Sequence, residues 1–265
     1  MAKRASKDVP IFVLGGYDLR GSLTQFEDMR SAMLERTDVL GDLYESYDYV
    51  GVRSAELSQE GFFEEANEDI DHHAHRALSS GRGVERVLIY GLEGTATGAG
   101  FEGWSGAIEV LYTVQATIGA MTKAKATYKS IGPVEHGKLL QLSPTWQLTG
   151  TSGTTGNTTA NPVDNGVSTT GGAGYFAYRS QGNANARIIH SSDAITWANL
   201  FTFTAAMDAT SSGNTNYQRG AQRLVTTAAI ERYTAIDITT ASSTGFKVQG
   251  ANFRSVFGLV RGLTS

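Results

Sequence analysis

The chain contains no cysteine, and only four of its 265 residues are proline. The lack of cysteine excludes a disulfide framework and any thiolate metal site. No apolar run reaches the roughly 18 residues that a membrane-spanning helix needs. The basic start Met1-Ala2-Lys3-Arg4 is not followed by the long apolar core of a signal peptide. These absences predict a soluble protein that is not exported, contacts no membrane and is stabilised by packing and assembly.

Glycine, in contrast, is abundant. The chain holds 31 glycines, 40% of its residues are hydrophobic, and Ser, Thr, Asn and Ala crowd its second half. This composition is typical of short strands that are joined by many turns. It predicts a mainly β protein and disfavours an all-helical one.

Charge is divided unevenly along the sequence. Residues 1–141 hold 21 acidic and 14 basic side chains, whereas residues 142–265 hold 5 and 8. The net charges are therefore −7 and +3. Because binding to phosphates needs a surplus of Lys and Arg, an acidic first half disfavours nucleic-acid binding. It suits a surface past which DNA slides.

A stretch of low complexity separates the two halves. Residues 148–174 contain a single charged residue, Asp164, and almost no large apolar side chain. Such a segment buries too little surface to offset its ordering entropy, although it can become ordered across a neighbouring subunit. We therefore predict a first domain over residues 1–145, a Gly/Ser/Thr-rich linker or arm over 146–174, and a second domain over 175–265.

The first domain begins with a series of strand patterns. The alternation of apolar and polar residues, interrupted by turn signals, predicts strands and a tight turn at Gly119–Thr122. The predicted strands cover residues 9–14, 22–34, 52–62, 84–92, 107–118 and 123–131.

One segment between these strands is rich in aromatic residues. Residues 37–50 place leucines and tyrosines among acidic side chains, which is typical of an exposed hairpin loop that contacts a partner. The alternative is that the tyrosines only cover the edge of a sheet. The candidate contact residues are Thr37, Leu40, Gly41, Asp42, Leu43, Tyr44, Tyr47 and Tyr49.

One helix is predicted directly after the strand that ends at Phe62-Phe63. Ala66, Ile70 and Ala74 recur at helical spacing, and acidic residues occupy the first turns. Acidic residues near the start complement the helix dipole, and Gly81 is well placed to end the helix. The helix is expected to pack its narrow apolar face against the sheet.

The order of these patterns resembles that of the tail-tube proteins of long-tailed phages. The resemblance covers about residues 8–142 and is carried, in order, by IFVLGGYDLRGSL, LERTDVLGDLYESYDYVGVRSAELSQEGFFEEA, the helix, AIEVLYTVQATIGAMTKAKATYKS and IGPVEHGKLL. It implies a β-sandwich or barrel with one flanking α-helix, whose strands join between subunits into a continuous barrel. The loop over residues 37–49 would then contact the neighbouring ring.

The resemblance also implies partners and a location. The chain is expected to form homo-hexameric or pseudo-hexameric stacked rings in the virion tail, assembled in the host cytoplasm. Further partners would be other tail proteins, such as terminator, tape-measure and distal-tail proteins. Genome DNA would pass through the lumen without specific binding. The resemblance does not separate a tube subunit from a terminator or a distal-tail ring, which share the fold and differ in whether stacking continues.

The second half predicts another β-sandwich. It resembles a module of phage virion proteins in which a strand ending in His190-Ser191-Ser192-Asp193 precedes a buried Trp197 and an Arg232-Tyr233 strand. This module would be an outward accessory domain or a second, diverged tube domain. An alternative function is a carbohydrate- or surface-binding β-sandwich of the virion. The predicted core comprises Ile188, Trp197, Leu200, Phe203, Leu224, Ile230, Ile236, Ile238, Phe246 and Val248.

Several motifs point superficially to catalysis or to metal binding. His72 and His75 share a helical spacing with zinc sites but lack a general-base motif. The glycines of residues 98–103 match a dinucleotide fingerprint but precede a strand, which predicts a loop there. The side chains of residues 190–193 are neighbours in the sequence, so they cannot converge from separate elements as those of a hydrolytic triad do. We expect no enzyme activity, no cofactor and no metal.

Overall fold

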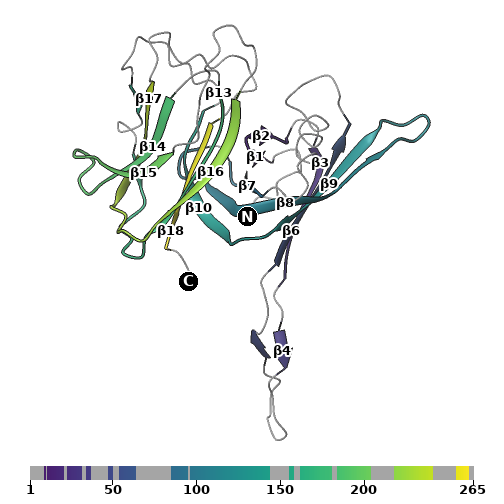
Figure 1. The fold of residues 1–265 in the computed structure, drawn as a ribbon, viewed down its shortest axis with the longest axis horizontal. Coiled ribbons are helices and arrows are strands. Elements are labelled where there is room, and N and C mark those ends of the chain that lie inside the picture. The colour runs from purple at the N-terminus through teal and green to yellow at the C-terminus, as the bar shows by residue number, and fades with distance from the viewer. Residues whose placement is uncertain are drawn as a thin grey trace, which may run out of the picture.

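The structure is a computed structural model, and it is built from strands (Figure 1). It describes residues 9, 11–20, 23–31, 34–36, 47–49, 54–63, 85–94, 96–143, 155–157, 162–180, 184–203, 218–240 and 255–262. The predicted mainly β class is confirmed. The predicted helix after Phe63 lies outside the described residues. Within these residues, no helix is long and apolar enough to cross a membrane.

Eighteen strands are described. In chain order they are β1 Ile11–Leu14, β2 Tyr17–Asp18, β3 Leu23–Ser31, β4 Leu34–Arg36, β5 Tyr47–Tyr49, β6 Ser54–Phe62, β7 Arg86–Gly91, β8 Gly100–Gln115, β9 Lys123–Ser130, β10 Val134–Ser143, β11 Thr155–Asn157, β12 Val163–Asp164, β13 Gly172–Ser180, β14 Ala184–Ser191, β15 Ala198–Phe203, β16 Gln218–Thr226, β17 Tyr233–Thr240 and β18 Ser255–Arg261.

An 11-stranded sheet forms the centre of the molecule, with its main path in the order β16-β13-β18-β10-β8-β7-β1-β2. This path curls, because the β1–β2 turn comes back against β16. A Cβ atom on Gly16 would lie 2.5 Å from the backbone nitrogen of Gly220. Only glycine permits so close an approach, and its positive φ of 88° also favours glycine.

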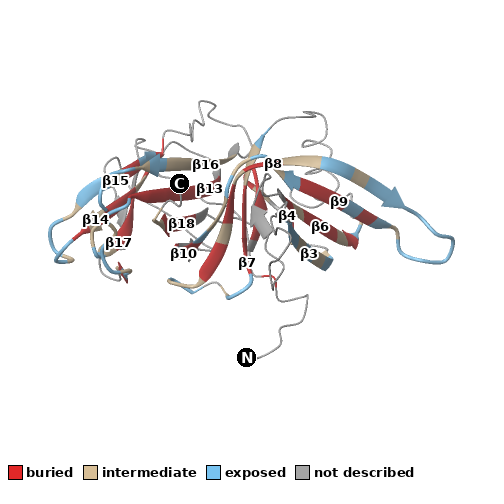
Figure 2. Ribbon diagram, turned by 90° about the horizontal axis from the view of Figure 1, so that it is seen from below, coloured by how far each residue is buried: buried red, intermediate tan, exposed pale blue. Residues whose placement is uncertain are grey.

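Three apolar clusters pack against the two faces of this curled sheet. One cluster lies within the curl and includes Val13, Phe101 and Tyr175. On the opposite face, a second cluster joins β1, β7 and β8 to β6 and β9 around Trp104 and Tyr128. A third joins β10, β13 and β18 to the sheet β11-β17-β14-β15 around aromatic rings that include Phe176, Phe203 and Phe257. The sheet is therefore buried on both faces along much of its length (Figure 2).

The central sheet contains strands from both of the predicted domains. Strand β18, at the end of the chain, lies between β10 of the first half and β13 of the second, and hydrogen bonds with both. Parts of the predicted linker form β11 and β12, which pair with β17. The two-domain division stays a prediction, while the central sheet crosses its boundary.

Several local expectations were wrong. Trp197, predicted to be buried, is only partly buried, whereas Trp104 is fully buried. The strand expected at residue 107 begins at Gly100, so the glycine-rich stretch is largely strand rather than loop. Gly103 is required there by packing, since a Cβ atom would lie 2.6 Å from the ring of Tyr175. Predicted core residues Ile188, Phe203, Ile230 and Ile236 are confirmed as buried.

Candidate self-assembly interface

A four-stranded antiparallel sheet, β3-β6-β9-β8, branches from the central sheet and projects away from it (Figure 1). Strand β8 belongs to both sheets. Its first part pairs with β10 and β7, and its second part, from Ala107 onward, pairs with β9. A β-bulge between Glu109 and Leu111 lies near this change of partners. We call β3, β6, β9 and residues 107–115 of β8 the projecting sheet.

Both outer edges of the projecting sheet are open within the described part of the chain. Strand β3 pairs with β6 alone over its nine residues. On the other side, residues 108–115 pair with β9 alone, because the pairing with β7 ends at Ala107. Open edges present unpaired backbone amide and carbonyl groups, which can pair with another chain.

The two faces of the projecting sheet differ in chemistry. One face carries Leu57, Ala126 and Tyr128, which are buried against the central sheet. The other face carries lysine and glutamate side chains, among them Lys123, whose ammonium lies 2.6 Å from the carboxylate of Glu60. The sheet therefore packs on the subunit with one face and exposes a charged surface with the other.

Apolar side chains are exposed on both edge strands and at the hairpin tip between β8 and β9, which Figure 2 shows as exposed. Met29 on β3 and Leu111 on β8 are 46% and 47% exposed. By register, both lie on the charged face. Exposed apolar groups on edge strands favour pairing with another chain over solvent exposure. The other exposed apolar residues of this hairpin are Val110, Val114, Ile118 and Met121.

The loop that the sequence predicts as a contact site is only partly described. Thr37, Leu40, Gly41, Asp42, Leu43 and Tyr44 lie outside the described residues. Tyr47 and Tyr49 belong to β5, opposite Arg36 and Leu34 of β4. The β4–β5 pair lies beyond the ends of β3 and β6, at a distance from the rest of the sheet (Figure 1).

Polar groups fasten β3 to the central sheet. The hydroxyl of Tyr90 donates to the Asp28 carboxylate at 2.5 Å, and Arg30 donates to both groups at 3.0 Å. Burial, followed by the hydrogen bond to Asp28, raises the pKa of Tyr90 well above its usual value. Arg30 also lies 3.3 Å from Glu102, which in turn contacts His136 at 3.1 Å. This network orients the open edge strand relative to the subunit body.

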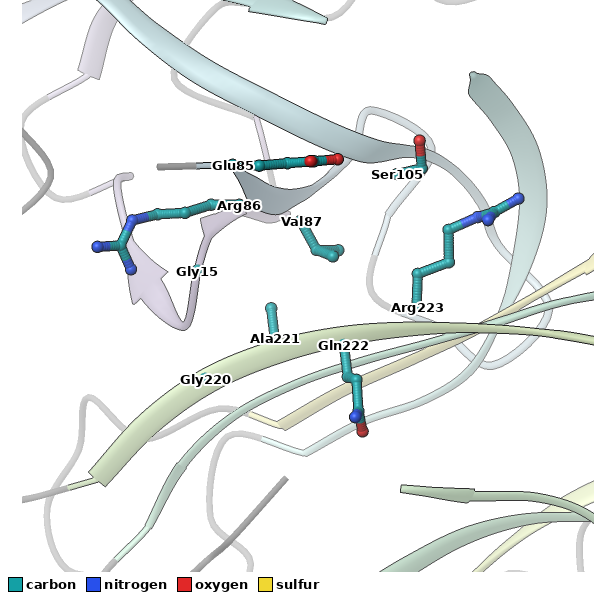
Figure 3. Close-up of a pocket in the computed structure, with 9 residues that line it drawn as sticks. All are labelled: Gly15, Glu85, Arg86, Val87, Ser105, Gly220, Ala221, Gln222 and Arg223. Atoms are coloured by element: carbon teal, nitrogen blue, oxygen red, sulfur yellow. The ribbon is translucent and has the colours of Figure 1, made fainter. Parts of the chain in front are cut away.

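A cavity of about 610 Å³ lies where the curled sheet fails to close, between β7 and β16 (Figure 3). Val87 and Ala221 face each other across it. The guanidinium of Arg223, on its wall, is bound by Glu135 at 2.5 and 2.8 Å, and the Tyr175 hydroxyl donates to the same carboxylate at 2.5 Å. Burial and Glu135 raise the pKa of Tyr175. With these partners, Glu135 acts as a structural anion that ties β10 to β13 and β16.

Residues 190–193, which contain the three residue types of a hydrolytic triad, comprise the end of β14 and the start of the turn that follows it. The Ser191 hydroxyl donates to Asp193 at 2.8 Å, and the same carboxylate accepts the backbone amides of Thr196 and Ile195, each at 2.8 Å. These amides and the serine lower the pKa of Asp193 to about 2. Nδ1 of His190 accepts the amide of Glu231 at 3.1 Å, so the histidine is oriented toward that backbone instead of toward Ser191.

Metal-ligating residues do not gather in the part of the chain that is described: no group of three His, Asp or Glu side chains there could hold an ion. The candidate ligands His72, His73 and His75, with Glu68 and Asp69, lie outside that part.

Comparisons with known proteins give structural neighbours only. No family model and no curated protein matches the chain. A chain from the virion of a native gene transfer agent particle matches with 16% identity and a TM-score of 0.38, over 50% of this chain and 97% of that one. A chain from the tail of an empty gene transfer agent particle, refined with C6 symmetry, matches with 18% identity and a TM-score of 0.37 over the same shares.

A third match extends further along the sequence. The SPP1 Dit (gp 19.1) protein, described as a hub of the adsorption apparatus in phages of Gram-positive bacteria, covers 96% of this chain and 99% of its own length. Its identity is 10% and its TM-score 0.35. TM-scores this low carry no functional argument.

The sequence indicates this interface only in part. It predicts the hairpin of residues 107–131, but not that β8 starts seven residues earlier and changes partners within one strand. The large apolar residues Phe101 and Trp104 were a weak signal, because they are three residues apart and lie on opposite faces of the strand.

Proposed function

We propose that this chain is a structural subunit of a phage tail tube, which assembles edge to edge through the projecting sheet. The observation that carries the proposal is the pair of open edges, β3 on one side and residues 108–115 of β8 on the other. When β3 of one copy pairs with β8 of the next, each copy is paired at both of its open edges. Repeated around an axis, such a contact closes into a ring and removes every free edge.

Closure also determines which face points inward. The buried face of the projecting sheet carries the described core of the subunit, whereas the charged face is exposed. When a sheet closes into a barrel, the bulk of each subunit is accommodated on the outside, where the circumference is larger. The charged face would therefore line the lumen, and genome DNA would pass it without specific binding.

Stacking of rings needs a second contact, which we assign to residues 37–49. The β4–β5 pair extends this hairpin away from the sheet, in the direction of β3 and β6 (Figure 1). An arm of this kind can reach a ring above or below its own. The sheet formed by β11, β17, β14 and β15 packs on β10, β13 and β18, away from the projecting sheet, and would lie on the outside of the tube (Figure 1).

The proposal is tested by placing a charge on each open edge. We expect the double variant Met29→Lys/Leu111→Lys to raise the protein concentration needed for assembly at least about tenfold, because like charges meet across the new seam. Both side chains are about half exposed, so the folded subunit tolerates the change. Light scattering and negative-stain microscopy of the purified protein measure assembly.

Ile195→Lys is the matched control, since Ile195 is exposed but lies in the turn between β14 and β15. It should assemble as the unmodified protein does. Normal tubes from the edge double variant would contradict the proposal. Single rings that never stack would assign the chain to a tail terminator or distal ring, and a strictly monomeric protein that binds glycans would support the surface-binding alternative.

A further inference from the structure

The charged face of the projecting sheet carries equal numbers of positive and negative side chains on neighbouring strands. Strand β9 presents its lysines at alternate positions, which places them on one face. Strands β6 and β3 present glutamates on that same face, as their register with β9 shows. The residues concerned are Lys123, Lys125 and Lys129 on β9, Glu56 and Glu60 on β6, and Glu27 on β3.

The lysines of β9 lie against the glutamates of β6. The ammonium of Lys123 contacts Glu60 at 2.6 Å, and that of Lys129 contacts Glu56 at 3.6 Å. Lys125 stands directly opposite Glu60 in the register of the two strands. Two glutamates therefore lie beside three lysines, and we call this arrangement the Lys–Glu ladder.

Stability does not account for the ladder. The side chains of Lys123 and Lys129 are more than half exposed, and their partners are about one-third exposed. Exposed ion pairs contribute little to the free energy of folding, because water already solvates both charges and salt screens their attraction. Each pair does, however, weaken the attraction between its lysine and any further anion that approaches.

A polyanion that approaches this face must compete with glutamate for each lysine. Duplex DNA gains affinity when lysines displace its condensed counterions, and lysines that are already paired with carboxylates displace fewer of them. Without the glutamates, the face would present a row of three unpaired lysines on each copy. A ring of such copies would hold a passing duplex through many phosphate contacts.

We propose that the partner of this face is duplex DNA, and that Glu56 and Glu60 shield the lysines of β9 so that the DNA passes without being held. This inference rests on the proposed function, because the DNA meets the ladder only if the charged face lines the lumen. It adds a device to that function: the wall combines lysines that could bind phosphate with glutamates that prevent them from doing so.

The test measures DNA binding by the full-length protein below its assembly concentration, so that the charged face is accessible. The probe is a fluorescent 30-base-pair duplex, and anisotropy is recorded at 50 and 200 mM salt. We expect Glu56→Gln/Glu60→Gln to bind at least tenfold more tightly than the unmodified protein at 50 mM salt. Its affinity should fall about 40-fold by 200 mM salt, the dependence of about three released phosphate contacts.

Two controls separate the ladder from a general change in charge. Glu85→Gln/Glu231→Gln removes two negative charges outside the projecting sheet and should leave DNA binding as weak as in the unmodified protein. Adding Lys123→Gln, Lys125→Gln and Lys129→Gln to the first variant should abolish the gain. Near-ultraviolet circular dichroism checks that each variant is folded.

The shielding proposal is overturned if Glu56→Gln/Glu60→Gln binds no more tightly than the Glu85→Gln/Glu231→Gln control. It is also overturned if the unmodified protein binds DNA as tightly as the shield variant. Failure of the tube proposal would appear elsewhere, as an absence of rings in micrographs of the unmodified protein, and does not depend on these affinities.

Discussion

The projecting sheet and the sheet β11-β17-β14-β15 are both antiparallel, yet their edge strands differ in length and in exposed apolar side chains. Edge strand β15 has six residues, and bulges interrupt its pairing with β14 as they do the pairings of β3 and β8. Edge strand β3 has nine residues, and the open part of β8 extends for eight, with apolar side chains exposed on both. Short edges resist pairing with another chain, whereas long edges with apolar groups favour it.

In the described part of the chain, exposed apolar residues gather at the projecting sheet and are scattered elsewhere, as the proposed edge-to-edge assembly requires. Of the exposed large apolar residues, Val167, Ile195 and Val225 are scattered over the second half of the chain. Those of the projecting hairpin gather within residues 110–121. Scattered apolar residues are ordinary on protein surfaces, whereas a gathered set marks an interaction site.

The strongest way to break the comparison is to weaken β18, which lies between β10 and β13 in the central sheet and packs against the sheet β11-β17-β14-β15. Phe257→Ala in β18 removes a fully buried ring that lies 4.4 Å from the ring of Phe176. We expect the free energy of unfolding to fall by about 3–5 kcal/mol, because the cavity adds to the lost burial. Urea denaturation followed by tryptophan fluorescence measures this change.

Because β18 also pairs with β10, the transition of the whole central sheet should move with it. Phe257→Leu, which keeps most of the side-chain volume, should lower the free energy of unfolding by less. A first-half transition that stays in place in Phe257→Ala would show that the two regions unfold independently.

A smaller effect is expected from a substitution that concerns the projecting sheet alone. Tyr90→Phe removes the hydroxyl that joins Asp28 and Arg30 of β3 to β7. Since that hydrogen bond involves a charged acceptor, we expect a loss of about 1.5–3 kcal/mol in the free energy of unfolding. The assembly concentration should also rise, because the open edge is held less firmly.

Tyr233→Phe on β17 is the matched control for Tyr90→Phe, because its ring contacts Arg232 through its face and keeps that contact without the hydroxyl. Chemical denaturation and light scattering measure both variants. Equal changes in Tyr90→Phe and in this control would contradict the role assigned to the network around Asp28.

The smallest expected effect concerns pH and the turn between β14 and β15. The pKa of Asp193 is lowered to about 2 by the amides of Thr196 and Ile195 and by Ser191. A carboxyl whose folded pKa lies below its unfolded value of about 3.9 stabilises the fold above that value and loses this effect as the pH falls toward 2.

The turn should therefore loosen between about pH 4 and pH 2, which the amide signals of Ile195 and Thr196 report in NMR spectra. Asp193→Asn should remove most of this pH dependence. Amide signals that move with a midpoint near pH 4 would show that the turn does not hold the carboxylate in its charged form.

Local patterns in the sequence predicted many of the strands. Residues 9–14, 52–62 and 123–131 contain the observed strands β1, β6 and β9 to within a few residues, because alternation and turn signals are local. The start of β8 was not predicted, since Gly100 and Gly103 read as loop residues. In the structure both are strand residues, and position 103 requires glycine because the ring of Tyr175, 72 residues further along the chain, occupies the space of a side chain.

The candidate site could be predicted less well than the strands. The hairpin and its exposed apolar residues follow from the sequence, but its open edges depend on which strands lie beside it. The pairing of Lys123 with Glu60 joins residues 63 positions apart and follows from the register of β6 and β9. No local pattern contains that register.

By itself, the sequence determined the mainly β class, the absence of disulfides, the acidic first half and the strongly patterned strands. These depend on composition and on neighbours within a few residues, which act in any fold. Only the tertiary structure decided that β18 lies between the two halves, that two edges stay unpaired among the described strands and that lysines contact glutamates on one face. Strand pairing is a long-range choice: burial and register across the whole sheet select it, and a one-residue slip would turn every side chain to the other face.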